Sequence, residues 1–182
     1  MSKAVLISIH PRWCEKIASG KKTIEIRKTR PKLQPPFKCF IYCTMDHPYI
    51  SVSCGELDKL NYRTNTVGRC NGKVIGEFVC DRIFPIDVYD NGCIKDWNFE
   101  CMWQACLPYE GIAAYIGREK RGYGWHISNL KIYDTPKALS KFSRPFENCI
   151  DKVCDEFGCA SCENGGHIKR PPQSWCYVEE FR

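Results

Sequence analysis

The sequence predicts an α+β fold in which about five or six strands, with helices inserted between them, form a small mixed β-barrel. Two observations support this class. Short apolar runs of strand length recur along the chain, and three segments repeat apolar residues at helical spacing. The 182 residues, 43% of them hydrophobic, suffice for one domain with a substantial core. We therefore expect a single domain over residues 1–182, with an insertion at 46–72 and a cysteine-rich segment at 143–172.

The first half of the chain is predicted to contain a strand, a helix and two further strands. Residues 5–9 form an apolar run typical of a buried strand, and a helix follows at 11–19 with Pro11 in its first turn. Gly20 provides the left-handed residue that ends this helix, and a charged strand comes directly after it. Residues 37–43 are apolar enough to be buried on both faces. We expect the first helix to pack at the mouth of the barrel.

The second half is predicted to contain a long strand, two helices and two further strands. Gly76, inside the first of these strands, indicates a bend or a bulge. The two helices carry apolar residues at helical spacing, and the strand after them is either one bent strand or a pair. In order, these elements are assigned to residues 73–81, 96–106, 109–116, 122–133 and 176–181.

The most informative stretch is the charged strand that runs from Gly20 to Arg27. Because side chains alternate along a strand, Thr23, Glu25 and Arg27 share one row, and the isoleucines between them form the buried side. Lys22 lies just ahead of this row. Such a row of mixed charge is either a surface strand with two ion pairs or part of a binding site.

The same residues offer two kinds of chemistry. Lys22 could act as a general base, and the Thr23 hydroxyl as a nucleophile beside it. Alternatively, Lys22 and Arg27 could hold a phosphate while Glu25 accepts hydrogen bonds from the exocyclic amine of a nucleobase. The residues themselves leave both possibilities open.

The stretch from Gly20 to Arg27 fits the pattern G-x-K-x-x-E-x-R, which resembles the signature of the ASCH domain of the PUA-like superfamily. Residues 122–127 and 170–175 look like later stretches of ASCH proteins common in phages and prophages. The resemblance covers most of the chain. It implies a PUA-like β-barrel with a ligand cleft beside the first helix, and binding of RNA, a nucleotide or a modified nucleobase.

The resemblance also bears on catalysis. One bacterial branch with a similar strand hydrolyses N4-acetylcytidine by means of a lysine, a threonine and a glutamate. Lys22 aligns with that lysine, but Glu25 occupies the place of the nucleophilic threonine, and Thr23 is out of register. We therefore expect binding without turnover. The alternatives are an amidohydrolase or a ribonuclease, with these three residues as its catalytic groups, and a phage-type module for protein interaction.

Two later segments supply candidate walls for the cleft. In the first, Trp125 either stacks on a base or belongs to the core of the barrel, and His126 follows a basic loop. In the second, two prolines stiffen the approach to uncharged groups that can read base edges. The predicted ligand-binding residues are therefore Lys22, Glu25, Arg27, Trp125, His126, Gln173, Ser174 and Trp175.

The net charge and the absence of recognisable targeting segments indicate which partners and which location to expect. The 27 lysines and arginines exceed the 21 acidic residues and give a formal net charge of +6, a mild bias toward anionic partners. No apolar run is long enough to span a membrane, and the N-terminus lacks the features of a signal peptide. We expect a cytoplasmic protein without a membrane partner.

Fourteen cysteines are unusual for a chain of this length, and in a cytoplasmic protein they should be reduced. Most lie singly in apolar segments, where cysteine behaves as a small hydrophobic residue. Four others are closely spaced, and four thiolates can enclose a tetrahedral zinc ion. The candidate ligands of this structural zinc site are Cys149, Cys154, Cys159 and Cys162, and the alternative is a loop with free thiols.

Overall fold

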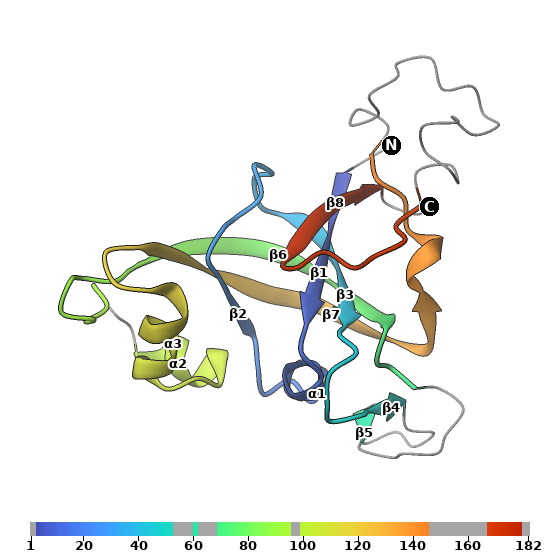
Figure 1. Ribbon diagram of the computed structural model, residues 1–182, viewed down its shortest axis with the longest axis horizontal. Coiled ribbons are helices and arrows are strands. Elements are labelled where there is room, and N and C mark those ends of the chain that lie inside the picture. The colour runs from blue at the N-terminus through green and yellow to red at the C-terminus, as the bar shows by residue number, and fades with distance from the viewer. Residues whose placement is uncertain (1–2, 53–59, 62–68, 96–98, 146–166, 180–182) are drawn as a thin grey trace.

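The computed structural model describes residues 3–52, 60–61, 69–95, 99–145 and 167–179. These residues form a mixed sheet, a separate two-stranded sheet and three α-helices (Figure 1). The helices are α1 (Pro11–Ala18), α2 (Phe99–Ala105) and α3 (Tyr109–Ile116), and a short 3₁₀ helix covers Leu139–Lys141. The strands are β1 (Lys3–Ile9), β2 (Ile24–Arg27), β3 (Phe37–Cys43), β4 (Ser51–Val52), β5 (Leu60–Asn61), β6 (Lys73–Asp87), β7 (Arg121–Ala138) and β8 (Trp175–Glu179).

The main sheet has six strands in the order β2-β7-β6-β3-β1-β8. Only the β1–β3 pair is parallel among these neighbours. The α+β class expected from the sequence is confirmed, but the sheet is open rather than closed into a barrel, with β2 and β8 at its edges. Side chains rather than backbone pairs link the two ends: Arg27 donates a hydrogen bond to Ser174 Oγ, and Trp175 donates one to Thr29 Oγ1.

Both faces of the central strands are buried, as their continuous apolar sequences require. In β1, Val5, Ile7 and Ile9 contribute to one apolar cluster, while Ala4 and Leu6 contribute to a second cluster on the opposite face. The first cluster also holds Phe78 and Trp125, and it receives α1 from outside the sheet. The packed sheet thereby fixes the ends of β1 and β2, between which α1 lies.

The first helix begins and ends as its sequence predicts. Pro11 occupies its first turn, and the side chain of His10 caps the N-terminus by accepting a hydrogen bond from Arg12 N. At the other end, Gly20 has a φ of 73°, which a residue with a Cβ adopts only under strain. The backbone of Lys22 then donates to Lys16 O. This turn directs the chain from α1 into β2.

The long strands β6 and β7 form an antiparallel pair across the molecule, with α2 and α3 in their connection (Figure 1). The bend predicted at Gly76 is present as a shift of register between Val74 and Gly76. Strand β2 pairs with β7, so that Glu25 lies opposite Trp125. On the other face of β2, Ile24 and Ile26 pack in a third apolar cluster with α3.

The predicted insertion at 46–72 is described in part and carries the short pair β4–β5. Asn71 fixes its base: its amide oxygen accepts from Ile50 N, and its amide nitrogen donates to the carbonyls of Asp46 and Pro48. Most of the cysteine-rich segment lies outside the described residues. In the part of the chain that the structure describes, no helix has the length and apolarity needed to span a membrane.

Candidate functional site

Strand β2 is buried on both faces, which corrects the expectation that its isoleucines alone form the buried side. Glu25 and Arg27 are each only 6% exposed, and Lys22 just before the strand is 2% exposed. Helices that follow much later in the sequence cover the isoleucines, while α1 and the approach to β8 lie near the charged row. Three charged side chains are thus held together away from solvent, which is costly unless they are paired.

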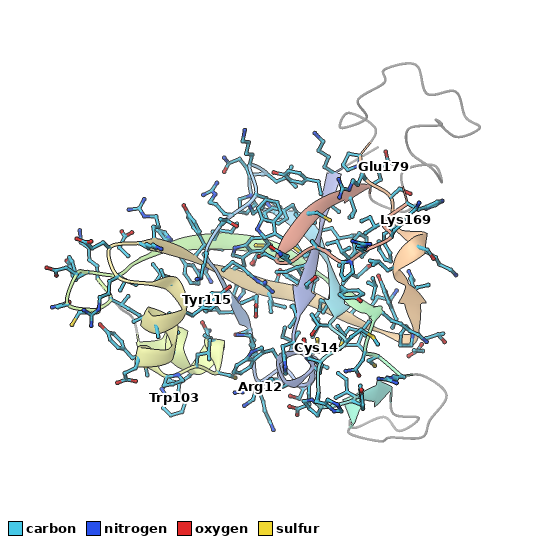
Figure 2. The ribbon with its side chains drawn as sticks, viewed as in Figure 1. Arg12, Cys14, Trp103, Tyr115, Lys169 and Glu179 are labelled. Carbon is cyan, nitrogen blue, oxygen red and sulfur yellow. The ribbon has the colours of Figure 1, made fainter. Side chains whose placement is uncertain are left out.

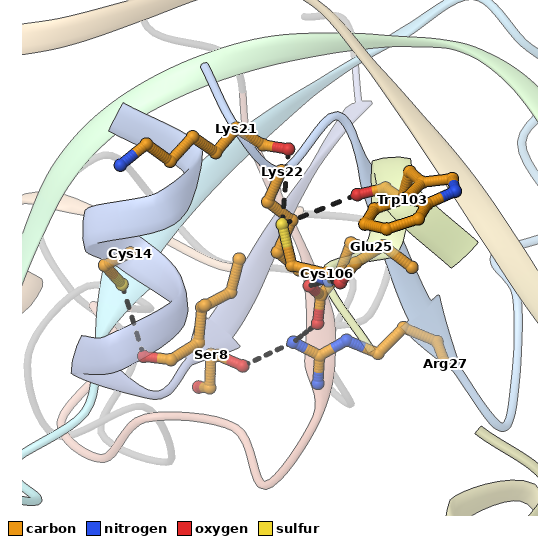
Figure 3. A network of polar contacts seen from close by, with 10 residues as sticks. Ser8, Cys14, Lys21, Lys22, Glu25, Arg27, Trp103 and Cys106 are labelled. Carbon is orange, nitrogen blue, oxygen red and sulfur yellow. Dashed lines mark hydrogen bonds and ion pairs between the residues drawn. The ribbon is translucent and has the colours of Figure 1, made fainter. Parts of the chain in front are cut away.

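These charges form one network centred on Glu25 (Figure 3). Its Oε2 lies 3.3 Å from Lys22 Nζ, and its Oε1 lies 3.0 Å from Arg27 Nη2. Lys22 Nζ also donates to Ala105 O at 2.7 Å, and Arg27 Nη2 donates to Ser8 O at 2.6 Å. The network therefore joins β2 to β1 and to the C-terminal end of α2.

Lys22 precedes β2, so the alternation of side chains along the strand does not fix its direction. Strand β2 begins at Ile24, so strict alternation does not reach back to Lys22 or Thr23. In the turn before the strand, Thr23 N donates to Gln104 O, while the Lys22 side chain extends to the carboxylate of Glu25. Lys22, Glu25 and Arg27 are therefore together, as the signature predicts.

Two polar atoms of the network have unused hydrogen-bonding capacity. Glu25 Oε2 is ion-paired with Lys22 but accepts no hydrogen bond from the described residues, and Arg27 Nε donates none to them. A buried acceptor or donor without a partner costs roughly 1–3 kcal/mol. The network thus contains an acceptor and a donor, both buried and without a hydrogen bond to the described residues, at neighbouring positions on one face of the strand.

The network forms part of the wall of a pocket of about 430 Å³. This volume is within the range of small-molecule sites. Aromatic side chains come from two helices, Trp13 from α1 and Tyr115 from α3, and Tyr115 is 40% exposed. The complete lining consists of Ser8, His10, Trp13, Lys22, Glu25, Ile26, Arg27, Leu107, Gly111, Tyr115 and Gln173.

Both aromatic rings of the pocket lie close to cations. The Arg12 guanidinium is 4.2 Å and Lys22 Nζ is 5.2 Å from the centroid of the Trp13 ring, and Lys28 Nζ is 5.2 Å from that of Tyr115. Burial raises the pKa of the Tyr115 hydroxyl, while Arg27 lowers it and Glu25 raises it. The Tyr115 hydroxyl therefore lies within electrostatic reach of the network.

The residues expected at 125 and 126 do not line this pocket. Trp125 is fully buried and packs edge-on against Phe37, with ring centroids 6.0 Å apart, so no face of its ring is open to a base. His126 pairs across the sheet with Ile24, on the face turned away from Glu25, and its Nδ1 lies 2.6 Å from Asp81 Oδ1. Trp125 thus has the core position that the sequence left as an alternative.

The segment before β8 lies closer to the site. Gln173 lines the pocket, and Ser174 Oγ accepts a hydrogen bond from Arg27 Nη1 at 3.4 Å. Trp175 is half-buried, packs against Trp125 at 6.0 Å and donates from Nε1 to Thr29 Oγ1. Gln173 therefore lines the pocket and Ser174 contacts the network through Arg27, whereas Trp175 links the segment before β8 to the residue that follows Arg27 and Lys28.

Thr23 and the cysteines lie away from the pocket or outside the described residues. Thr23, the nucleophile of the enzymatic alternative, is not among the residues that line the pocket. Cys14, Cys39, Cys43 and Cys80 are buried free thiols, and burial is the main cause that raises the pKa of Cys80 to about 12. The four candidate zinc ligands, Cys149, Cys154, Cys159 and Cys162, lie outside the described residues.

Sequence reasoning missed several pocket residues. By helical spacing Trp13 belongs to the apolar stripe of the first helix, although the basic residues at 12 and 16 on either side of it are a signal of an exposed ring edge. Tyr115 lies off the apolar stripe of its helix, which is a second signal. His10 and Leu107 carry no such signal, because only the folded chain brings them to β2.

Comparisons with known proteins agree with this architecture. The family model described as "ASCH domain" matches residues 7–67. The crystal structure of ASCH from Zymomonas mobilis is 18% identical, with a TM-score of 0.55, over 97% of this chain and 88% of that one. Two single-substitution variants of the Zymomonas protein match at 17% identity with the same TM-score, over 97–98% of this chain and 89–92% of theirs.

No curated protein sequence is significantly similar to this chain. The matches give no support to the phage or prophage type expected from the sequence. At identities below one fifth, the solved structures inform on the fold alone. Residues 7–67 therefore carry the sequence pattern of an ASCH domain, and the chain as a whole has the α+β fold of ASCH proteins.

Proposed function

We propose that the chain binds RNA, a nucleotide or a modified nucleobase, and that one base occupies the pocket beside α1 and β2. The observation that carries this proposal is the network of Lys22, Glu25 and Arg27, buried in the wall of a pocket of about 430 Å³. Its unused acceptor, Glu25 Oε2, and unused donor, Arg27 Nε, call for a ligand that carries a donor and an acceptor close together. The polar edge of a nucleobase has this property.

The aromatic walls support the same class of ligand. Every base has a π-face, and stacking on an aromatic side chain contributes about 1–3 kcal/mol per base. Trp13 and Tyr115 offer such rings at the pocket. The cations near these rings, Arg12 and Lys28, are exposed and suit a phosphate at the mouth of the pocket. The ASCH pattern of residues 7–67 agrees with nucleic-acid binding.

Binding without turnover is the version that the geometry favours. A lysine that serves as a base must direct its amine at a nucleophile. Lys22 Nζ instead donates to Ala105 O and pairs with Glu25, and Thr23 does not line the pocket. The hydroxyl of Ser8 does line it, but donates to Pro172 O at 2.6 Å. We assign positioning and recognition, rather than chemistry, to these groups.

The test compares buried with exposed cations by isothermal titration with nucleoside monophosphates and short RNA. Lys22→Met and Arg27→Lys should each weaken binding about tenfold or more. The first removes a charged donor from the base of the site, and the second replaces the planar guanidinium, with its Nε–H, by an ammonium group. Lys28→Ala should weaken binding less, and should reduce the salt dependence if it contacts a phosphate. Arg121→Ala is the matched control, since Arg121 is exposed and pairs with Asp87 outside the pocket.

Circular dichroism and thermal unfolding establish that each variant is folded before its affinity is interpreted. Unchanged affinity in both Lys22→Met and Arg27→Lys would contradict the proposal. The charged network would then serve only to hold β2 against its neighbours.

A further inference from the structure

Trp103 is the most exposed of the large hydrophobic side chains in the described residues, at 78%. It belongs to α2 and extends away from the sheet (Figure 2). The indole ring is large and apolar, with a single donor group, and tryptophan is enriched at recognition sites. Its exposure bears on the candidate site because Trp103 lies two residues before Ala105, whose carbonyl accepts a hydrogen bond from Lys22 Nζ.

Backbone contacts fix the turn that contains Trp103 against the network. The carbonyl of Ala105 accepts from Lys22 Nζ, and that of Gln104 accepts from Thr23 N. Cys106 joins both sides, because its thiol lies 3.2 Å from Lys21 O and 3.6 Å from Trp103 O (Figure 3). Trp103 is thus two residues from the carbonyl that holds Lys22, but its ring is outside the pocket.

The surface next to this turn is basic. Between residues 12 and 21 there are three basic side chains, Arg12, Lys16 and Lys21, against one acidic side chain, Glu15. Arg12 and Lys21 are exposed, and the backbone of Lys21 is bonded to Cys106. An exposed indole close in the fold to a basic segment of the chain suits a polyanion that carries aromatic groups, which is the chemistry of a single-stranded nucleic acid.

We propose that Trp103 is a second stacking platform, which takes the base adjacent to the one in the pocket. The ligand is then a single strand of at least two nucleotides rather than a free nucleotide. This inference rests on the proposed function, and adds to it the length of the ligand and a residue that no part of the ASCH pattern covers.

The experiment measures the affinity of the full chain for single-stranded hexanucleotides, each made of one kind of ribonucleotide or deoxyribonucleotide, and for the matching 5′-monophosphates. Trp103→Ala should weaken binding of the best hexanucleotide about tenfold and leave the monophosphate affinity unchanged, because it removes one stacked base. Trp103→Phe should retain most of the hexanucleotide affinity. Tyr89→Ala, at another exposed aromatic residue that lines no part of this pocket, should change neither affinity.

The outcomes separate this inference from the proposed function. If monophosphates and hexanucleotides bind equally well, or if Trp103→Ala leaves the hexanucleotide affinity unchanged, the inference is overturned while the pocket assignment stands. If Trp103→Ala weakens both probes to the same degree, Trp103 supports the pocket rather than a second base, and the inference also fails. If the wild-type chain binds no probe, both proposals fail. The ribose and deoxyribose series identify the kind of strand that is bound.

Discussion

Replacing Glu25 by glutamine tests the energetics of the buried network directly. The substitution keeps the shape of the side chain and removes only its charge, so that no cavity is created. Glu25 is the single acidic member of the network, with Lys22 Nζ at 3.3 Å and Arg27 Nη2 at 3.0 Å. All three side chains are at most 8% exposed, so the two cations would face each other with little screening by solvent.

The expected loss of stability is about 3–5 kcal/mol, the cost of leaving a buried charge without its partner. This is a large share of the roughly 5–15 kcal/mol that separate folded from unfolded states in ordinary domains. Lys22→Met should cost less, about 1–3 kcal/mol, because Glu25 keeps its ion pair with Arg27, although Glu25 Oε2 loses the ion pair with Lys22 and Ala105 O loses a donor. In the Glu25→Gln background the sign should reverse, since Lys22→Met then removes an unpaired cation.

The assay is urea unfolding of the wild type, the two single variants and the double variant, followed by tryptophan fluorescence and circular dichroism. Coincident transitions would justify a two-state analysis. A loss below about 0.5 kcal/mol in Glu25→Gln, typical of exposed ion pairs, would refute the reasoning. A double variant less stable than Glu25→Gln alone would also contradict it.

Three further predictions concern other parts of the chain. The Arg121 side chain donates hydrogen bonds to Asp87 and lowers its pKa. The pair therefore stabilises the fold above the ordinary aspartate pKa, and this stabilisation is lost as the pH falls through the lowered pKa. The urea concentrations at which wild type and Asp87→Asn are half unfolded should therefore differ at pH 6 and become equal by about pH 2. N4-acetylcytidine incubated with the protein should show little or no deacetylation by chromatography, and fast turnover abolished by Lys22→Ala and Glu25→Ala would favour the hydrolase. Elemental analysis should find about one zinc per chain, lost in Cys159→Ser; a metal-free wild type would exclude the site.

Local sequence patterns predicted most of the elements. The strand at 37–43 and the helix at 109–116 have the predicted bounds, and the first helix ends one residue earlier than expected. Apolar runs and helical spacing suffice for such elements because each is buried along its whole length or along one stripe. The strands at 73–87 and 121–138 are longer than predicted, since a shift of register between Cys80 and Ile83 carries the pairing beyond the polar residues Asp81 and Arg82 to Asp87.

The charged network was predictable from the family pattern, but its burial was not. The two-residue alternation of the strand predicts one dry face, whereas α3 and the approach to β8 cover both faces from distant parts of the chain. For the same reason Trp125 could be placed in the core only from the folded chain: its row faces Glu25 across β2 and β7, but Phe37 and Trp175 enclose its ring. Long-range packing, which leaves no local periodicity, decides both cases.

The central claim is that Arg27 and Glu25 receive a nucleobase, and the side-chain Nε–H of Arg27 reports on it most directly. This group donates no hydrogen bond within the described residues. Its ¹H–¹⁵N resonance, assigned with Arg27→Lys, can be followed while the best-binding nucleotide is titrated. A saturable downfield proton shift with the same dissociation constant as calorimetry is expected, because a ligand acceptor engages the Nε–H. A nucleotide that binds while this resonance stays unchanged would contradict the account.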